Sequence, residues 1–218
     1  VNVALIASIL GQWLKFSEKD IRILTISGLL HDIGKIMIPN EILTKPGKLT
    51  VAEYNIMKQH VNFGYEKVKN QNIDIRIKEA CLLHHEKCDG TGYPFGLKSD
   101  QIPAVAKIIA IADVYDALTS VRCYKNAYDH DTAIQMILEG QCGQFNPLLL
   151  ECLKEISPQL SRTFKKEKDD NREYYEAQRI SEEILRQNAL PRKDHSQRVI
   201  EIMQEKIKFF KENSGKIS

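Results

Sequence analysis

PAVAKIIAIADVYDAL (103–118) decides the fold class, because this run is almost entirely apolar and has the length of a helix. Pro103 is well placed in the first turn of such a helix, where its missing N–H costs nothing. A helix that is apolar on nearly every face is buried. The segment therefore predicts a helix in the core of the protein.

Helical signals continue on both sides of this run. Ser17 with Asp20, and Thr50 with Glu53, resemble capping boxes that open helices. The expected helices cover 3–14, 21–32, 51 to beyond 60, 74–85 and 103–118, then a short one after about 131 and one from Pro147, with loops over 38–50 and 88–103. No strand pattern is long enough to build a sheet, so the predicted fold is all-α.

The composition changes near the end of the chain. Residues 1–155 carry the helical core, and 156–218 are dense in mixed charge and contain two amphipathic helices. Such helices are marginal alone in water, so we expect them to pack on a second subunit or on the first domain. His195, in DHSQRV (194–199), is assigned to a linker helix because no His-Asp pair follows it.

The composition also limits the class of protein. The 218 residues carry a net charge of +2, which argues against binding a nucleic acid polymer, and no apolar run is long enough to span a bilayer. The five cysteines are an odd number without a CxxC pair. Reduced thiols and a cytoplasmic location are therefore expected.

Histidines and aspartates recur at or near the ends of the predicted helices. They are His31, Asp32, His60, His84, His85 and Asp113. Imidazole and carboxylate ligands suit iron, manganese, nickel or zinc. Adjacent residues diverge by about 100° on a helix, so His31 can face one ion while Asp32 bridges to a second. One buried histidine is more often a hydrogen-bonded core residue, but this recurrence predicts a metal site.

Four segments, in this order, resemble the motifs of the HD-GYP family, a branch of the HD phosphohydrolase superfamily. They are HDIGK (31–35), His60, HHEKCDGTGYP (84–94) and IADVYDALTSVRCYK (111–125). The resemblance covers roughly residues 1–155. It implies an HD-type bundle of about seven helices followed by the C-terminal helical extension. It also implies two or three divalent ions, most often iron or manganese and otherwise zinc or nickel, and hydrolysis of cyclic di-GMP to linear pGpG or further to GMP.

Carried over residue by residue, the resemblance assigns roles in this sequence. The implied metal ligands are His31, Asp32, His60, His84, His85 and Asp113. Asp32 is implied to be the bridging, catalytic carboxylate, and Lys35 to reach a phosphate oxygen and stabilise the transition state. Arg122 and Lys125 resemble the pair that grips the second phosphate and a guanine. Tyr93 is expected either to line the substrate groove or simply to pack.

Two departures from the family pattern affect these expectations. The family normally supplies another histidine ahead of the segment that matches VNVAL (1–5). We therefore expect one ion to lack a nitrogen ligand and to be weakly held, and we expect this chain to hydrolyse its substrate slowly. QFNP (144–147) stands where (H/Q)FDP is usual, with Asn146 in place of aspartate. Asp116, one turn after Asp113, is expected to support the ligands or the fold rather than bind metal.

Alternatives to a cyclic di-GMP phosphodiesterase stay open. The domain could be a catalytically impaired sensor that binds the nucleotide or docks a partner through the Gly-Tyr-Pro loop. It could also hydrolyse another nucleotide, such as cyclic GMP-AMP or an alarmone. The expected partners are cyclic di-GMP, a second copy of the chain through the C-terminal helices, and linked sensory or GGDEF-type cyclase domains.

Overall fold

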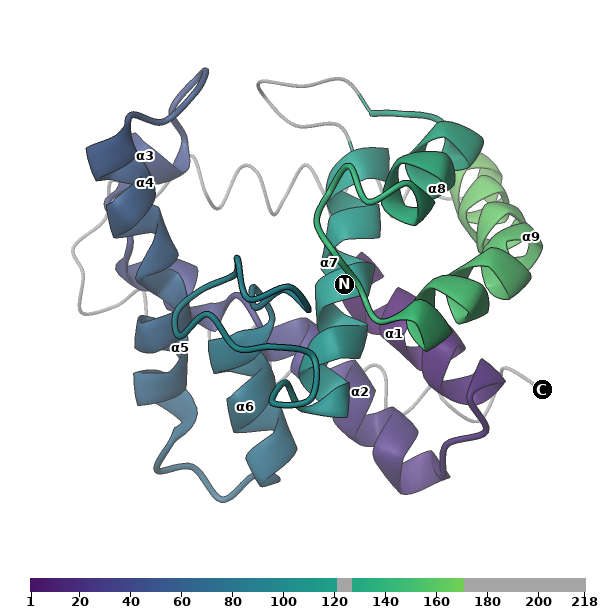
Figure 1. Cartoon of the computed structure of the whole chain (residues 1–218), viewed down its shortest axis with the longest axis horizontal. Helices are drawn as coiled ribbons and strands as arrows, with labels where there is room; N and C mark the ends of the chain where they lie inside the picture. Colours follow the sequence, from purple (N-terminus) through teal and green to yellow (C-terminus); the bar gives the residue numbers. More distant parts are fainter. Residues whose placement is uncertain (121–126, 171–218) are drawn as a thin grey trace. The chain divides into compact units, whose positions relative to one another are not determined.

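Helix α7 (Ala104–Thr119) is the central helix of the bundle, with α5 and α6 on one side and α8 and α9 on the other (Figure 1). The computed structural model describes residues 1–120 and 127–170, and side chains as far as Thr163. The buried residues of α7 are Val105, Ala106, Ile108, Ile109, Ala110, Ile111, Ala112, Tyr115 and Leu118. The predicted core helix is thus confirmed, with Pro103 at the N-cap, just before the first turn.

Most of the described residues lie in helices, and loops join these helices. The other helices are α1 (Asn2–Trp13), α2 (Glu18–Leu30), the 3-10 helix η1 (Ile33–Met37), α3 (Asn40–Leu43), α4 (Val51–Lys58), α5 (His60–Val68), α6 (Ile75–Leu83), α8 (His130–Leu138) and α9 (Pro147–Asp170). No strand occurs in these ranges, only an isolated bridge between Asp89 and Lys98. The all-α prediction is confirmed.

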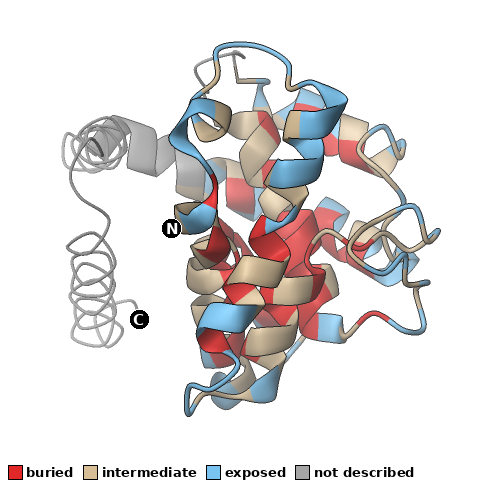
Figure 2. Ribbon diagram, turned by 90° about the vertical axis from the view of Figure 1, so that its left-hand side faces the viewer, coloured by how far each residue is buried: buried red, intermediate tan, exposed pale blue. Residues whose placement is uncertain are grey.

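The helices pack in two groups around α7. Helices α1 and α2 contact each other and α7, while α6 contacts α2, α5 and α7. Buried residues concentrate where these helices meet, and exposed residues lie on the outer faces and loop tips (Figure 2). Figure 1 shows that the chain passes from α2 through η1 to α4 and α5, and η1 packs directly on α5. This arrangement brings the ends of α2, α4 and α6 together.

Both predicted capping boxes open helices. The Ser17 hydroxyl accepts from the Asp20 N–H at the start of α2. Thr50 and Glu53 form the complete reciprocal box at the start of α4, because each side chain accepts from the other residue's N–H. Lys45 also binds the Glu53 carboxylate at 2.6 Å, which ties the preceding loop to the helix.

The structure differs from the prediction at several helix boundaries. Helix α2 ends at Leu30 and α6 at Leu83, so the His-Asp and His-His pairs follow the helices rather than lying inside them. The helix expected to run past position 60 divides into α4 and α5 at Gln59. This division, together with the one-turn α3, gives two more helices in the described residues than the seven expected.

A close backbone approach explains why the chain leaves helix α2 before the metal ligands. A Cβ added to Gly34 would lie 1.9 Å from the His60 carbonyl oxygen and 2.4 Å from the Gly64 nitrogen. Only glycine permits this contact, which seats η1 against α5. The tight turn of η1 follows directly after Asp32 and holds this residue next to His60.

The described residues up to Thr163 form one compact unit. Within the described ranges, no helix has the length and apolar character needed to cross a bilayer. The predicted tail helices and His195 lie outside the described residues, as do Arg122 and Lys125. The predicted domain division after residue 155 stays a prediction.

Candidate metal centre

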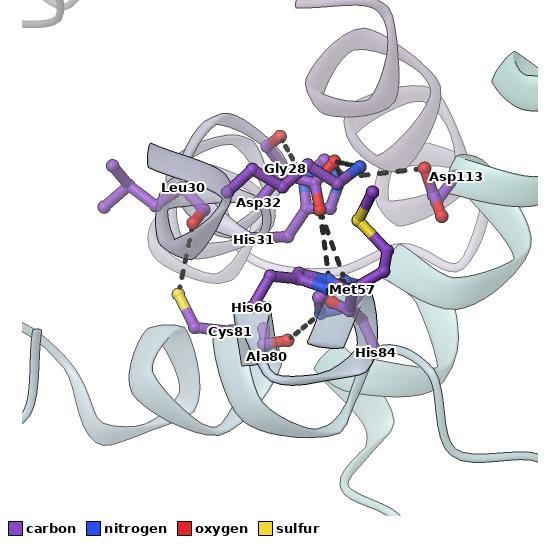
Figure 3. Close-up of polar contacts among 11 residues, drawn as sticks. Gly28, Leu30, His31, Asp32, Met57, His60, Ala80, Cys81, His84 and Asp113 are labelled. Atoms are coloured by element: carbon purple, nitrogen blue, oxygen red, sulfur yellow. Dashed lines mark hydrogen bonds and ion pairs between the residues drawn. The ribbon is translucent and has the colours of Figure 1, made fainter. Parts of the chain in front are cut away.

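The six ligands predicted from the sequence converge in one place. Their ligand atoms form two clusters, each with its atoms within 4.8 Å of one another: Asp32, His60, His84 and His85 in the first, and His31, Asp32 and Asp113 in the second. Asp32 belongs to both. Figure 3 shows its carboxylate between the imidazole rings of the α2, α5 and α6 segments, with Asp113 reaching in from α7. This arrangement matches the bridging role expected for Asp32.

Three of the histidines are oriented by the helix ends on which they lie. His31 caps α2, His60 follows the end of α4, and His84 caps α6. Their Nδ1 atoms lie 2.8–2.9 Å from the carbonyl oxygens of Gly28, Met57 and Ala80, one turn earlier in each case. Carbonyls in the last turn of a helix have acceptor capacity to spare. Because a carbonyl oxygen only accepts, each Nδ1 carries the proton and donates it.

The Nε2 atoms of His60 and His84 then point unprotonated lone pairs at each other and at Asp32. His60 Nε2 lies 3.3 Å from Asp32 Oδ1 and 3.4 Å from His84 Nε2. In the described part of the molecule, His31 Nε2 and Asp32 Oδ1 are buried without a hydrogen-bond partner. Buried acceptors that face each other without donors are unfavourable. A divalent cation among them removes this cost, so the side chains present fit a metal centre.

The pKa values of the buried groups favour the ligand forms of three histidines. Burial lowers the pKa of His85 to about 4, and burial is also the main cause that lowers the pKa of His60 and His84. These rings are therefore neutral at pH 7. Histidines with free lone pairs bind metals most readily, so no proton has to leave before an ion binds.

His31 differs from the other three because two carboxylates face it. Its Nε2 lies 3.3 Å from Asp32 Oδ2 and 3.6 Å from Asp113 Oδ1. Burial lowers the pKa of His31, but the charge of Asp32 and the contacts with Asp113 outweigh burial and raise the pKa to about 10. The two carboxylates around His31 Nε2 therefore favour a positive charge at this place. A bound metal ion supplies such a charge.

Lys35 lies in the site, as the sequence predicted. Its Nζ is 2.5 Å from Asp32 Oδ2, and its side chain is about one-third exposed. Burial alone raises the pKa of Asp32, but the charges of Lys35 and His31 hold it well below its usual range. Asp32 is thus a carboxylate at neutral pH, and part of the Lys35 side chain is exposed.

The loop after His85 folds back over the site. The Tyr93 ring stacks on the His85 ring with centroids 4.7 Å apart, and a Cβ on Gly92 would meet backbone atoms of residues 85–87 within 2.5 Å. The buried Glu86 carboxylate accepts from the N–H groups of Phe95 and Leu97 at 2.7 and 2.9 Å. The sequence reasoning missed Glu86, although a glutamate directly after two ligands within the loop motif was a signal.

Other expectations concern residues near the clusters. Asp116 lies outside both of them and accepts from Asn2 of α1 and from Ser120, which suits a role in the fold. Burial raises the pKa of the Cys81 thiol to about 12, and none of the described cysteines forms a disulfide. Asn146 accepts from the Leu148 N–H, so it caps α9 as an aspartate could.

Comparison with known proteins agrees with this geometry. The family model described as "HD domain" matches residues 2–147. Over 159 residues the chain is 42% identical to the cyclic di-GMP phosphodiesterase response regulator RpfG of Xanthomonas campestris, an alignment that covers 72% of this chain and 42% of that protein. It is also 38% identical over 157 residues to the 3'3'-cGAMP-specific phosphodiesterase 2 of Vibrio cholerae, covering 71% and 30%. The chain thus spans less than half the length of these relatives.

A solved structure shares the fold. Bd1817, described as an HDG"Y"P protein from Bdellovibrio bacteriovorus, superposes with a TM-score of 0.61 at 22% identity and covers 73% of this chain and 50% of that one. At this identity the likeness concerns the arrangement of helices alone.

Proposed function

The chain belongs to the HD domain family and is homologous to HD-GYP cyclic di-GMP phosphodiesterases, and from this we propose that it is a metal-dependent phosphodiesterase that hydrolyses cyclic di-GMP to linear pGpG. The observation that carries the proposal is Asp32, which belongs to two clusters of ligand atoms at once. A shared carboxylate keeps two ions close to each other and to one phosphodiester.

The proposal assigns the six clustered residues as ligands. His31 and Asp113 would hold one ion, His60, His84 and His85 would hold the other, and Asp32 would contribute to both. When bound, such a pair of ions supplies Lewis-acid polarisation of the phosphodiester and acidifies the attacking water. The Nδ1 hydrogen bonds of His31, His60 and His84 to main-chain carbonyls hold these three rings in place, as hydrogen bonds to the far nitrogen of a ligand histidine do in other metal sites.

Lys35 has two tasks in this proposal. Its ammonium holds Asp32 in the carboxylate form and in one orientation. The same group donates to a phosphate oxygen and stabilises the charge that grows there during attack. Arg122 and Lys125 keep their proposed role at the second phosphate and guanine.

The substrate class comes from the relatives, whose names describe them as phosphodiesterases of cyclic di-GMP or of 3'3'-cGAMP. Cyclic di-GMP is the first choice because relatives of that description reach 44% identity, against 38% for the cyclic GMP-AMP enzyme. Both substrates offer phosphodiesters to the same site, and they differ only in one base.

The test uses the full 218-residue chain, loaded with manganese or ferrous iron and supplied with each cyclic dinucleotide, with products separated by chromatography. Formation of pGpG that requires metal supports the proposal, and preferred cleavage of 3'3'-cGAMP makes that the substrate instead. Asp32→Asn should abolish turnover, while Asp100→Asn, on an exposed loop, should not. Metal-loaded protein that binds cyclic di-GMP without cleaving it would replace the proposal with a sensor role.

A further inference from the structure

A row of side chains leads from the metal centre to the surface of α4. Tyr93 stacks on His85, and Lys58 Nζ lies 6.0 Å from the centroid of the Tyr93 ring. The same ammonium lies 5.3 Å from the centroid of the Tyr54 ring, one helical turn earlier. Tyr54 is 49% exposed. The row therefore starts at a metal ligand and ends at an aromatic face that solvent reaches.

Lys58 gives this row a positive charge without a compensating carboxylate. Among the described residues, no aspartate or glutamate forms an ion pair with Lys58. The nearby acidic side chains are occupied elsewhere, because Glu53 pairs with Lys45 and Asp32 pairs with Lys35. Lys58 is half-buried between two rings, so an anion beside it meets a charge that water screens only partly.

We propose that Tyr54 and Lys58 form a nucleotide subsite on α4, in which the Tyr54 ring stacks on a purine base and Lys58 donates to a phosphate oxygen of the same nucleotide. This inference rests on the proposed function and extends it by naming where part of the substrate lies. A base has an aromatic face on which the Tyr54 ring can stack. The adjoining phosphate has a negative charge that can pair with the Lys58 ammonium.

The chemistry of the row fits a nucleotide better than a simple phosphodiester. Stacking of a base on an aromatic side chain is favourable for every base, and an ammonium next to two rings adds a cation–π contribution. A small diester without bases uses the metal centre alone. A cyclic dinucleotide is large enough to occupy the metal centre and extend along the Tyr93 ring to α4.

The test measures binding and turnover separately, on the full chain. Affinity for cyclic di-GMP is measured by calorimetry on chelator-treated protein, and KM and kcat are measured after manganese is restored. Tyr54→Ala should weaken affinity about thirtyfold, the middle of the range for one stacked base, and Tyr54→Phe should restore it. The loss of activity should appear in KM rather than in kcat. Lys58→Met should weaken binding by a similar factor and reduce its dependence on salt.

Ile56→Ala is the matched control. Ile56 is 42% exposed on the same helix, about 200° around the axis from Tyr54, so its truncation should leave affinity within about twofold. Unchanged affinity and KM in Tyr54→Ala, in protein that cleaves cyclic di-GMP, would overturn the subsite and leave the proposed function standing. Tyr54-dependent binding without any turnover would keep the subsite and remove the proposed function. Wild-type protein that, with manganese restored, neither binds nor cleaves cyclic di-GMP overturns both.

Discussion

The Nε2 atoms of His60 and His84 lie 3.4 Å apart, and both are acceptors because each ring donates its Nδ1–H to a main-chain carbonyl. Two lone pairs at this distance repel unless a cation lies between them or beside them. The fold therefore maintains an unfavourable contact that metal binding relieves, and several predictions rest on this relationship.

Metal should stabilise the fold. A ligand at 100 times its dissociation constant contributes about 2.7 kcal/mol to the free energy of unfolding, which for a chain of this size raises Tm by about 5–10 °C. Thermal unfolding with manganese and with chelator measures this shift. His84→Gln should remove most of it. His130→Gln, which breaks contacts with Tyr115 and Ser157 away from the clusters, should lower Tm but keep the shift.

Asp32 and Asp113 should affect metal content differently. Because Asp32 serves both clusters and Asp113 only one, Asp113→Asn should remove mainly the ion of the second cluster, which is already the more weakly held one in the wild type, and Asp32→Asn should leave little of either ion. Elemental analysis after gel filtration counts the ions. Equal losses in the two variants would contradict the bridging position of Asp32. Asp100→Asn serves as the control.

Glu86 should contribute strongly to the stability of the fold, although it is not a proposed metal ligand. Glu86→Ala leaves the N–H groups of Phe95 and Leu97 without their acceptor, which should lower the free energy of unfolding by about 2–4 kcal/mol. Urea titration measures this loss. Glu86→Gln keeps one oxygen acceptor and should lose about 1 kcal/mol. Truncation of the exposed Glu41 should change stability by less than about 0.5 kcal/mol.

Arg122 should act on the substrate and not on the metal. Arg122→Ala is expected to weaken cyclic di-GMP binding by about 1.5–3 kcal/mol, the range for hydrogen bonds to charged groups. The metal content should remain that of the wild type because Arg122 is not a proposed ligand. Calorimetry with cyclic di-GMP and elemental analysis of the same sample separate the two effects, and an unaltered affinity would exclude Arg122 from the site.

Acid should weaken the fold partly through Asp74. Hydrogen bonds from the Arg76 side chain and then from its N–H lower the pKa of Asp74 to about 2 from 3.8. The folded state therefore binds this proton more weakly than the unfolded chain. The resulting stability is present above pH 4 and is lost as pH falls towards 2. Arg76→Met removes the side-chain part, so its urea midpoint should fall less steeply with acid between pH 4 and 2 than the wild-type midpoint.

The sequence predicts the parts of this molecule that depend on local pattern. The core helix α7 is apolar on nearly every face, and the caps at Ser17 and Thr50 are short-range motifs, so both are evident before folding. The side chains that cluster were also predictable, because their residue types and order suit a metal site. The arrangement of these side chains in space depends on where the helices end. Those boundaries depend in turn on packing against other segments.

Longer-range contacts account for what the sequence did not predict. Glu86 binds main-chain groups nine and eleven residues later, within an irregular loop that has no periodic pattern. The row from Tyr93 to Tyr54 joins a loop to a helix that lies more than 30 residues earlier in the chain. Neither relationship leaves a trace in hydrophobic spacing, because the first uses backbone partners and the second joins partly buried side chains to one exposed ring.

The approach of Gly34 to the backbone of α5 has a consequence for how the protein can change. The spacing between Asp32 and His60 is set by main-chain atoms in contact, with no side chain between them that substitution could enlarge or shrink. Core replacements elsewhere can shift α6 or α7 by fractions of an ångström and so move the other ligands. Adaptation of the site to an ion of different radius is therefore confined to His84, His85 and Asp113, while the pair formed by Asp32 and His60 stays constant.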